Sequence, residues 1–590
     1  MKHYYLLLFL FIYQYNWGQS GSSDLETKYE KTQGTETVTY EEGIDYLTKL
    51  ANTFKTIQLQ TIGTTDIGKP LHLAIFSLDQ DFDPASVKAK GRNVFMINNA
   101  IHPGEPDGVD ASLMLFRNMA NSKRLQRILK NTVVIMVPFY NVGGAINRNR
   151  YSRANQNGPK SYGFRGNSRN LDLNRDFIKL DAKNSHAFVD IFQTWSPDLY
   201  IENHVSNGAD YQHVLTYLAT QSDKLGGKLG TYLKKTLIPD LKQKMKKQKW
   251  SIIPYVNVYG NRTPNEYGIP QFFDSPRYSS GYASLFHSLG FINETHMLKP
   301  FKQRVMATYD FMIAMLEHLN KQGKQIQQMR KATAAKVAQQ QKFTIGWKMD
   351  RSQFKEITFK GYTPKMIDSK VTGKKRLFYD RAQPVTKKIK YYNVFKPSLT
   401  IQKPKAYVIS KAWHNVIDLL KKNGVKVQQL TKDQTIAVDA YYITDYKSYS
   451  QPFEGHYVHY ATQVNTKPQK VKFYEGDYVV FVNQPANKYI IATLEPQATD
   501  SFFSWNFFDT ILQQKEGFSS YVFEDIAEKL LKESPDLRKR FEAKKQADAK
   551  FRENARQQLT FIYQNSPYYE KEHLRYPIFR YVKDQNLSVK

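Results

Sequence analysis

Between residues 40 and 319 the chain alternates apolar runs rich in β-branched and aromatic residues with segments of helical periodicity. The clearest strand candidates are HLAIFSL (72–78), NVFMINNA (93–100), TVVIMVPFYN (132–141), DLYIENHV (198–205) and GFINET (290–295). Runs that are apolar throughout are typical of strands buried on both faces. Residues 107–120 space their apolar side chains as a helix does, directly after Pro106. The alternation predicts an α/β domain with a mainly parallel mixed sheet flanked by helices.

The rest of the chain differs in character. Residues 304–341 have a helical pattern that is amphipathic at first and polar later, so we expect residues 326–342 to connect two domains. Residues 343–590 are dominated by Tyr- and Val-rich strand candidates, with one strand–helix–strand pattern at 406–430. We therefore expect an α/β domain at 20–325, followed by a β-rich α+β accessory region.

The first residues have the composition of a secretory signal peptide. Lys2 precedes an apolar stretch at 4–13 that is too short to span a bilayer, and cleavage is expected near Gly18 or Gln19. We therefore assign residues 1–19 to a signal peptide. No later run approaches 18 apolar residues, so we expect an exported protein, periplasmic or secreted, with no transmembrane segment after cleavage.

Composition excludes several chemistries. The 590 residues include no cysteine, so disulfides, Cys-ligated metals and thiol nucleophiles are ruled out, and any metal site must use His and carboxylates. The formal net charge is +31. The lysines are nevertheless spread along the chain, and the densest run, 234–249, has the pattern of a solvated helix face. Because no nucleic-acid-binding motif accompanies the charge, we expect no nucleic-acid partner.

The first cluster of polar residues is NNAIHPGEPDG, residues 98–108, at the end of a predicted buried strand. Pro103 and Gly104 prevent a regular helix, so His102 and Glu105 are expected on a turn that lets both side chains converge. A neutral imidazole and a carboxylate arranged in this way suit Zn²⁺. A pair of this kind is common in purely structural roles, so by itself it is weak evidence for a metal.

Three further clusters follow in the same domain. NLDLNRDF, residues 170–177, has the alternation of a strand that presents Asn174 and Arg175. The guanidinium group and the side-chain amide of this pair can both donate hydrogen bonds to a substrate carboxylate. His204 and Glu294 each come at the end of an apolar strand candidate. Sites in parallel sheets lie beyond the carboxyl ends of the strands, which is where all of these residues are predicted to be.

The order of these motifs resembles that of the zinc metallocarboxypeptidases related to pancreatic carboxypeptidase A, in their large exported bacterial form. The motifs are HPGE (102–105), NVGG (141–144), RYSR (150–153), NLDLNRDF (170–177), His204 and ETH (294–296). The resemblance covers roughly residues 40–320. It implies a carboxypeptidase-like fold for this part of the chain and zinc-dependent hydrolysis of peptide bonds.

The resemblance also implies individual roles. One zinc ion per chain would be held by His102, Glu105 and His204, with water in the open position of the site. Glu294 would be the general base, taking a proton from that water and passing it to the leaving amine. Asp172 would orient the imidazole of His102 from behind.

Substrate-binding roles follow from the same resemblance. Arg153 would polarise the scissile carbonyl and stabilise the oxyanion, and Asn174 and Arg175 would grip the terminal carboxylate of the substrate. The family also closes its site with a tyrosine that has no secure match in this sequence. Tyr278 and Tyr282, both in SPRYSSGY, are the two candidates.

Three functions stay open on the sequence. The first is a carboxypeptidase that releases C-terminal residues from peptides, which Asn174 and Arg175 favour. The second is an amidase or endopeptidase that acts on peptidoglycan-derived peptides with the same residues. The third is a non-catalytic protein that binds peptide or glycan, and the retained His102, Glu105, His204 and Glu294 argue against it. The sequence predicts neither the preferred terminal residue nor the oligomeric state.

Overall fold

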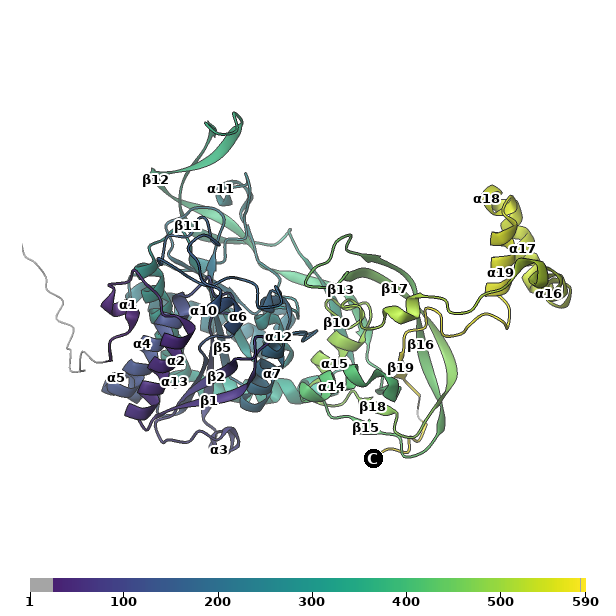
Figure 1. Cartoon of the computed structure of the whole chain (residues 1–590), viewed down its shortest axis with the longest axis horizontal. Coiled ribbons are helices and arrows are strands. Elements are labelled where there is room, and N and C mark those ends of the chain that lie inside the picture. The colour runs from purple at the N-terminus through teal and green to yellow at the C-terminus, as the bar shows by residue number, and fades with distance from the viewer. Residues whose placement is uncertain (1–24, 584) are drawn as a thin grey trace, which may run out of the picture.

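The computed structural model describes residues 25–583 and 585–590, and the predicted signal peptide lies outside these residues. The first domain is built on a sheet that has eight strands within the described residues, in the order β1-β2-β4-β3-β5-β9-β6-β7 (Figure 1). The strands are β1 (Ile57–Thr64), β2 (Pro70–Phe76), β3 (Asn93–Asn98), β4 (Thr132–Val137), β5 (Leu199–Ser206), β6 (Leu215–Ala219), β7 (Ile253–Pro254) and β9 (Leu289–His296).

The four strands at the centre of this sheet, β4, β3, β5 and β9, run parallel to one another. The pairs β1–β2, β2–β4 and β6–β9 are antiparallel, which makes the sheet mixed. Every residue of β3, β4 and β5 is buried, as the mainly apolar runs predict for β3 and β4, and β5 also buries the polar residues Glu202, Asn203 and His204. The α/β architecture expected from the sequence is therefore confirmed, and the carboxyl ends of the central strands meet at one edge.

Helices cover both faces of the sheet. On one side lie α2 (Tyr40–Thr53), α4 (Asp107–Asn121) and α13 (Phe301–Gln339), and on the other lie α7 (Lys183–Trp195) and α12 (Ser279–Leu285) (Figure 1). Helix α4 begins right after the turn that carries His102 and Glu105, with Pro106 as its N-cap residue. This packing supports the strand ends from both sides, so the residues beyond them are held on a rigid base.

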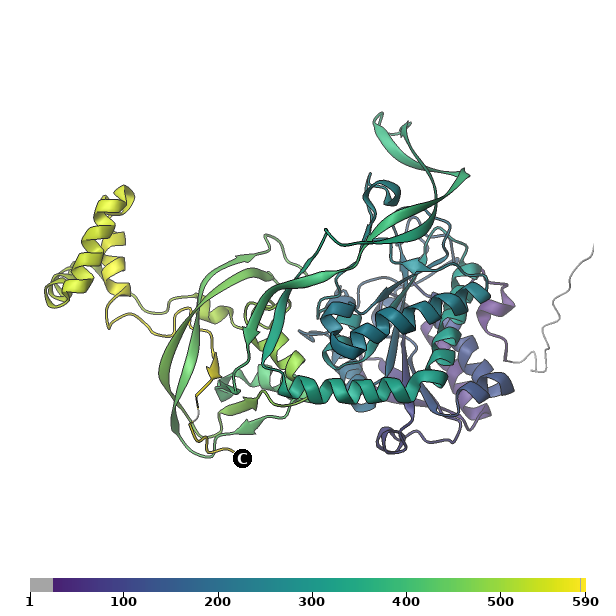
Figure 2. The same cartoon turned by 180° about the vertical axis from the view of Figure 1, so that it is seen from behind.

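The helical connector expected at 326–342 forms the second half of one continuous helix. Helix α13 runs for 39 residues, from the sheet of the first domain to the C-terminal region (Figure 2). The expected domain limits at residues 325 and 342 stay a prediction. Among the described residues, no helix combines the length and the apolar character needed to cross a bilayer.

The C-terminal region contains a second sheet, with six strands in the described residues in the order β15-β18-β14-β19-β16-β17. Its strands are β14 (Ala406–Ile409), β15 (Gln428–Gln429), β16 (Gln434–Ser448), β17 (His459–Phe473), β18 (Tyr478–Phe481) and β19 (Ile578–Tyr581). The predicted strand–helix–strand unit is β14, α14 (His414–Lys422) and β15. The β-rich character expected for this region is therefore present.

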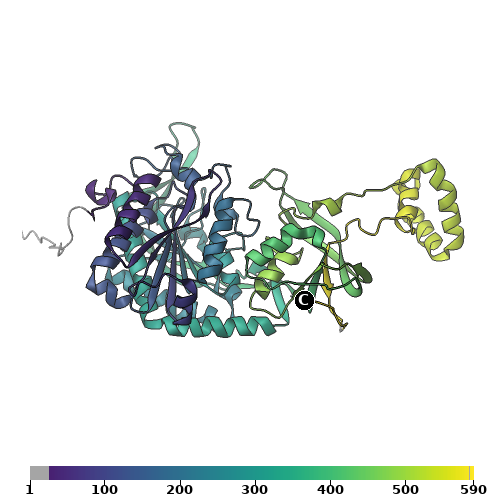
Figure 3. The ribbon, with the colours of Figure 1, turned by 60° about the horizontal axis from the view of Figure 1, so that its bottom comes forward.

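Two extensions leave the body of the molecule. The hairpin of β11 (Lys355–Asp368) and β12 (Lys375–Tyr392) projects from the first domain (Figure 2), and its base packs against that domain through Phe359 and Ile389. A small helical unit projects from the second sheet and has its own apolar core (Figure 3). Its helices are α16 (Ser520–Glu533), α17 (Pro535–Ala547), α18 (Ala549–Arg552) and α19 (Ala555–Gln564).

Candidate active site

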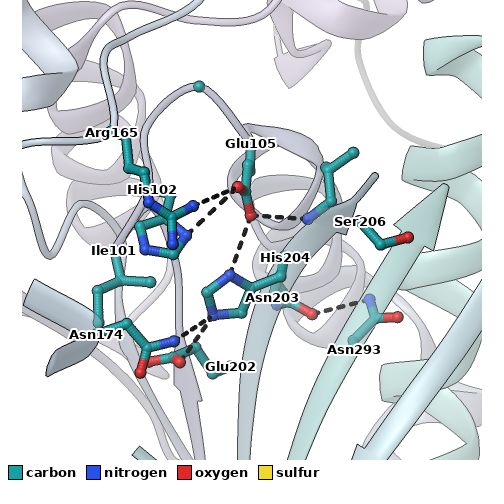
Figure 4. Close-up of polar contacts among 12 residues, drawn as sticks. Ile101, His102, Glu105, Arg165, Asn174, Glu202, Asn203, His204, Ser206 and Asn293 are labelled. Carbon is teal, nitrogen blue, oxygen red and sulfur yellow. Dashed lines mark hydrogen bonds and ion pairs between the residues drawn. The ribbon is translucent and has the colours of Figure 1, made fainter. Parts of the chain in front are cut away.

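Three buried side chains converge beyond the carboxyl ends of β3 and β5 (Figure 4). His102 and Glu105 lie on the turn between β3 and α4, where the Glu105 N–H donates to the carbonyl oxygen of His102. His204 lies in β5. One potential ligand atom from each of the three lies within 4.8 Å of the others, and this is the one such group of three found in the described residues.

The two imidazoles present the same nitrogen to the centre of this group. The Nδ1 of His102 lies 3.4 Å from Glu105 Oε1, and the Nδ1 of His204 lies 3.0 Å from Glu105 Oε2. Their Nε2 atoms face carboxylates behind them, at 2.8 Å from Asp172 Oδ1 and 2.8 Å from Glu202 Oε2. A carboxylate that accepts a hydrogen bond from Nε2–H leaves the Nδ1 lone pair free for a metal ion.

These residues fit zinc. The buried Nδ1 of His102 has no hydrogen-bond partner among the described residues. Burying an unpaired polar atom costs folding free energy unless another group, such as a metal ion, binds to it. Two imidazole nitrogens and one carboxylate are a donor set that zinc takes in catalytic sites, where a fourth position stays open. The structure therefore places His102, Glu105 and His204 together, as the sequence predicts, and Asp172 behind His102.

Glu202 is a further candidate site residue, which the sequence motifs did not single out. It is fully buried, and it also accepts hydrogen bonds from Asn98, Tyr200 and Ser279, at 2.8, 2.9 and 2.7 Å. Tyr200, Glu202 and His204 alternate along β5, so they share one face of the strand. The two-residue spacing in DLYIENHV was a signal that could have identified Glu202 as the partner of His204.

Electrostatic interactions keep Glu105 ionised. Burial by itself would raise the pKa of Glu105, but Arg153 and the two imidazoles outweigh burial and hold that pKa well below its usual range. The Arg153 guanidinium donates to Glu105 Oε1 at 2.6 Å and to the carbonyl oxygen of Val205 at 2.7 Å. A charged carboxylate in a buried position is the form that a metal ion requires.

Glu294 lies near the carboxyl end of β9 and is paired with His204 in the parallel register of β5 and β9. It is partly exposed, whereas the rest of β9 is buried. It lines a cavity of about 600 Å³ together with the three ligand residues. Burial and the charge of Glu105 raise the pKa of Glu294 to about 7, and this net value includes the opposing effect of His204, Arg153 and Arg165. A carboxyl group with this pKa can both accept and return a proton near neutral pH.

Asn174 and Arg175 also line the cavity, but they lie in a 3₁₀ helix (Leu173–Arg175) and not in the strand that their sequence predicts. The carboxylate of Asp172 accepts the Asn174 N–H at 2.9 Å, and this cap turns the chain. The side chain of Asn174 lies against His204, and the guanidinium of Arg175 stacks 4.6 Å over the ring of Tyr278. The prediction of a strand at 170–177 was therefore wrong.

The two tyrosine candidates have different surroundings. Tyr278 lies just before α12 and lines the cavity. Tyr282 lies one helical turn later and is completely buried, with its hydroxyl bonded to Gln193 at 2.9 Å and to Asn423 at 2.7 Å. Although the two residues are about one helical turn apart, Tyr278 faces the cavity and Tyr282 lies in the packed core. The expectation that Tyr282 binds substrate is therefore corrected.

Three cavity residues were not singled out in the sequence. Arg165 lies 2.8 Å from Asp172 and 3.5 Å from Glu105, and nearly half of its side chain is exposed. Tyr255 and Tyr259, on the loop after β7, also line the cavity and are hydrogen-bonded to each other through their hydroxyl groups. No spacing pattern marks these positions, because their segments reach the cavity only in the folded chain.

Comparison with known proteins finds a family match for part of the chain. Residues 44–209 match the family model described as zinc carboxypeptidase. The similar curated proteins include Carboxypeptidase 2 of Trichophyton rubrum, 31% identical over 111 residues, and Carboxypeptidase 2 of Trichophyton tonsurans, 30% identical over 109 residues. Each match covers 18% of this chain and 20% of the relative, so the chain spans about a fifth of the length of these relatives.

The solved structures that resemble this one include a metallo-carboxypeptidase from Burkholderia cenocepacia, at 13% identity and a TM-score of 0.36, with 48% of this chain and 69% of that chain covered. Another is carboxypeptidase A from Helicoverpa armigera, at 15% identity and a TM-score of 0.37, with 51% and 75% covered. Glu294 and Tyr278 lie beyond the segment matched by the family model. The segment at residues 44–209, which supplies all three candidate metal ligands, is thus similar to the zinc carboxypeptidases.

Proposed function

We propose that the chain is a zinc-dependent peptidase that releases residues from the C-terminus of peptides. The observation that carries this proposal is one cavity that contains the metal-ligand group, Glu294, and the Asn174–Arg175 pair. The first two suit hydrolysis, and the third suits a free carboxylate. Non-catalytic binding of a peptide would use the third feature and would give no reason for a carboxyl group with a pKa near neutrality beside a metal site.

Zinc bound by His102, Glu105 and His204 would supply Lewis-acid polarisation and a water molecule of lowered pKa. The protein supplies the proton transfer, because the Glu294 carboxylate faces the same cavity and can accept a proton and later donate it to the leaving amine. Arg153 adds a fixed positive charge at the cavity wall for the developing oxyanion. Its contacts with Glu105 and Val205 hold it in place before substrate arrives.

Substrate orientation falls to Asn174 and Arg175. The Nη1 of Arg175 donates to the carbonyl oxygen of Asn174 at 2.7 Å, and its guanidinium plane is held against Tyr278. A guanidinium whose plane is already set by stacking loses little entropy when it binds a carboxylate. We propose that Tyr278, and not Tyr282, is the tyrosine that contacts substrate. The substrate is a peptide or a peptidoglycan-derived peptide.

The test uses the zinc-loaded protein and pairs of peptides that differ only in a free or an amidated C-terminus, with products identified by mass spectrometry. We expect stepwise loss of terminal residues from the free peptides and little change in the amidated ones. Internal cleavage, or hydrolysis of peptidoglycan peptides alone, would instead support the endopeptidase or amidase function. Tight binding without any hydrolysis would support a binding protein. Export through residues 1–19 is part of the proposal, and the N-terminal residue of the protein recovered outside the cytoplasm tests it.

A further inference from the structure

The loop that joins β16 to β17 ends against the part of the first domain that carries Asp172 and Arg175. Main-chain hydrogen bonds between Phe453 and His456, at 2.8 and 3.1 Å, close this loop into a tight turn. Glu454 lies at its tip with a φ of 52°, a left-handed conformation that a non-glycine residue keeps only where its surroundings hold it. The Oε2 of Glu454 accepts the main-chain N–H of Asp172 at 2.6 Å.

A second contact holds the other end of the same segment. The Nε2 of His456 lies 2.8 Å from Asp181 Oδ2, and the buried ammonium group of Lys179 lies 2.6 Å from the same carboxylate oxygen. The loop therefore contacts the stretch from Asp172 to Asp181 near both of its ends. Between these contacts lie the 3₁₀ helix and its two cavity residues.

The neighbouring segment that carries Tyr278 is held by the C-terminal region as well. The main-chain N–H of Arg277 donates to Asp500 Oδ2 at 2.9 Å, and its Nε donates to Asp500 Oδ1 at 2.6 Å. The guanidinium also stacks over Trp505 and Phe453, at 4.8 and 5.4 Å. Asp500 and Trp505 are buried, so this is a packed contact and not a surface ion pair.

The contact with Glu454 matters because Asp172 is bonded to several functional groups at once. The Asp172 carboxylate binds the His102 Nε2 and the Asn174 N–H through the same oxygen, Oδ1. Glu454 binds the main-chain N–H and leaves the Asp172 oxygens to those partners. A shift of this peptide would therefore move Asn174 and Arg175 relative to the cavity, with no direct loss of a metal ligand.

We propose that Glu454 is a positioning residue, through which the C-terminal region holds Asn174 and Arg175 in the geometry that receives a substrate carboxylate. The peptidase site is thus completed by a loop from outside the segment that matches the zinc carboxypeptidase family. The part of this inference that concerns substrate rests on the proposed function, whereas the part that concerns the position of the 3₁₀ helix does not.

The kinetic test uses the full-length, zinc-loaded protein and a peptide with a free C-terminus. Glu454→Ala is expected to raise KM about tenfold, because it removes a charged acceptor from a partly buried N–H, while kcat stays near the wild-type value. Glu454→Gln is expected to restore KM, since its amide oxygen can accept the same N–H. Glu475→Ala, at an exposed turn position of the same region, is the matched control. A wild-type KM in Glu454→Ala, or a Gln variant as impaired as the Ala variant, would overturn the proposal.

Hydrogen exchange gives a readout that does not depend on hydrolysis. We expect faster exchange at residues 172–177 in Glu454→Ala than in wild type and in Glu475→Ala, because the N–H of Asp172 loses its acceptor. Unchanged exchange at these residues would contradict the positioning role even if KM rises. If the wild-type protein hydrolyses no peptide, the peptidase function fails, and the exchange comparison alone decides whether Glu454 positions the helix.

Discussion

His204 and Glu294 occupy the same register position on two neighbouring parallel strands, β5 and β9. One residue is a candidate metal ligand and the other the candidate general base, and both are at strand ends that the sheet holds rigidly. Their relative placement therefore depends on main-chain pairing in the core and not on a flexible loop. This arrangement would allow a proton acceptor to face a bound metal ion before any substrate binds.

We predict that Glu294→Gln lowers kcat for peptide hydrolysis by about 10²–10⁴-fold, because the amide can no longer accept a proton. Zinc content and melting temperature should stay near wild type, since Glu294 is not among the three clustered ligands. Stopped assays and elemental analysis of the same preparation measure both quantities. Glu266→Gln, at an exposed position, is the control. Turnover near the wild-type rate in Glu294→Gln would refute its role as the base.

Metal loading should stabilise the folded protein. Each tenfold rise in free zinc above the dissociation constant adds about 1.4 kcal/mol to the free energy of unfolding, so the melting temperature should rise with zinc and fall with a chelator. His204→Ala should remove this zinc dependence, because the site loses one of its three clustered ligands. Thermal scans over a zinc series, with elemental analysis expected to give about one zinc per chain, check the prediction. A zinc-independent melting temperature in the wild type would contradict a native metal site.

Glu202→Gln should weaken zinc binding by about 10–100-fold, as is usual when a carboxylate behind a metal-bound imidazole is lost. Glu202 faces the Nε2 of His204 and is fully buried. Competition with a chelator of known affinity measures the effect. Glu495→Gln changes an equally buried glutamate in the C-terminal region, so it should alter stability but not zinc affinity. Equal zinc affinity in Glu202→Gln and wild type would show that Glu202 has no part in orienting His204.

Arg175→Ala should raise KM about 10–100-fold for peptides with a free C-terminus, because the substrate carboxylate loses one charged hydrogen-bond donor. The KM for amidated peptides should change little. Arg169→Ala is the control, because Arg169 binds the carbonyl oxygen of Asp181 and does not line the cavity. Steady-state kinetics on matched peptide pairs provide the measurement. Equal losses on free and amidated peptides would indicate that Arg175 does not bind the terminal carboxylate.

The stability of the first domain should depend on pH through Asp110. Burial and the charge of Asp107 raise the pKa of this carboxyl group in α4 to about 7, and this net value includes the opposing effect of the hydrogen bonds to Thr37 and Val38 and of the charge of Arg148. Because the folded-state pKa lies above the unfolded value of about 3.9, the folded state binds the proton more tightly. The resulting stabilisation is fully present below about pH 4 and is lost as the pH rises through about 7.

Asp110→Asn should remove this dependence, because an amide cannot ionise. Urea unfolding at a series of pH values between 5 and 8 is expected to show a smaller fall in the free energy of unfolding for Asp110→Asn than for wild type. Asp45→Asn changes an exposed acid on the neighbouring helix α2 and serves as the control. The same slope in wild type and Asp110→Asn would show that Asp110 stays ionised in the fold.

Much of the fold and of the site could be read from local patterns. Mainly apolar runs identified the strands β3, β4, β5 and β9, because strands buried on both faces are rich in apolar residues. His102, Glu105, His204 and Glu294 were recognisable because each lies near or just after the carboxyl end of one of these strands. A local pattern gave the wrong prediction for the segment 170–177. Its alternation is that of a strand, but the Asp172 carboxylate caps a 3₁₀ helix there. A side-chain cap of this kind overrides a short alternating pattern.

Other features depend on contacts between distant parts of the chain. Tyr278 and Tyr282 are alike in sequence, and only the packing of α12 decides that one lines the cavity and the other lies in the core. Arg165 reaches Asp172 through a loop without regular structure. Glu454 reaches the same residue from 282 positions further along the chain.

The sequence by itself determined the chemistry of the site, because a turn with His and Glu, a strand-end His and a strand-end Glu are local features that the strand pattern places at one edge of the sheet. Only the tertiary structure decided which residues orient that chemistry: Glu202 behind His204, Tyr278 beside Arg175, and Glu454 against the peptide of Asp172. The physical reason is that the ligands are fixed by the ends of hydrogen-bonded strands. Their supporting residues are instead brought together by packing between segments that share no local pattern.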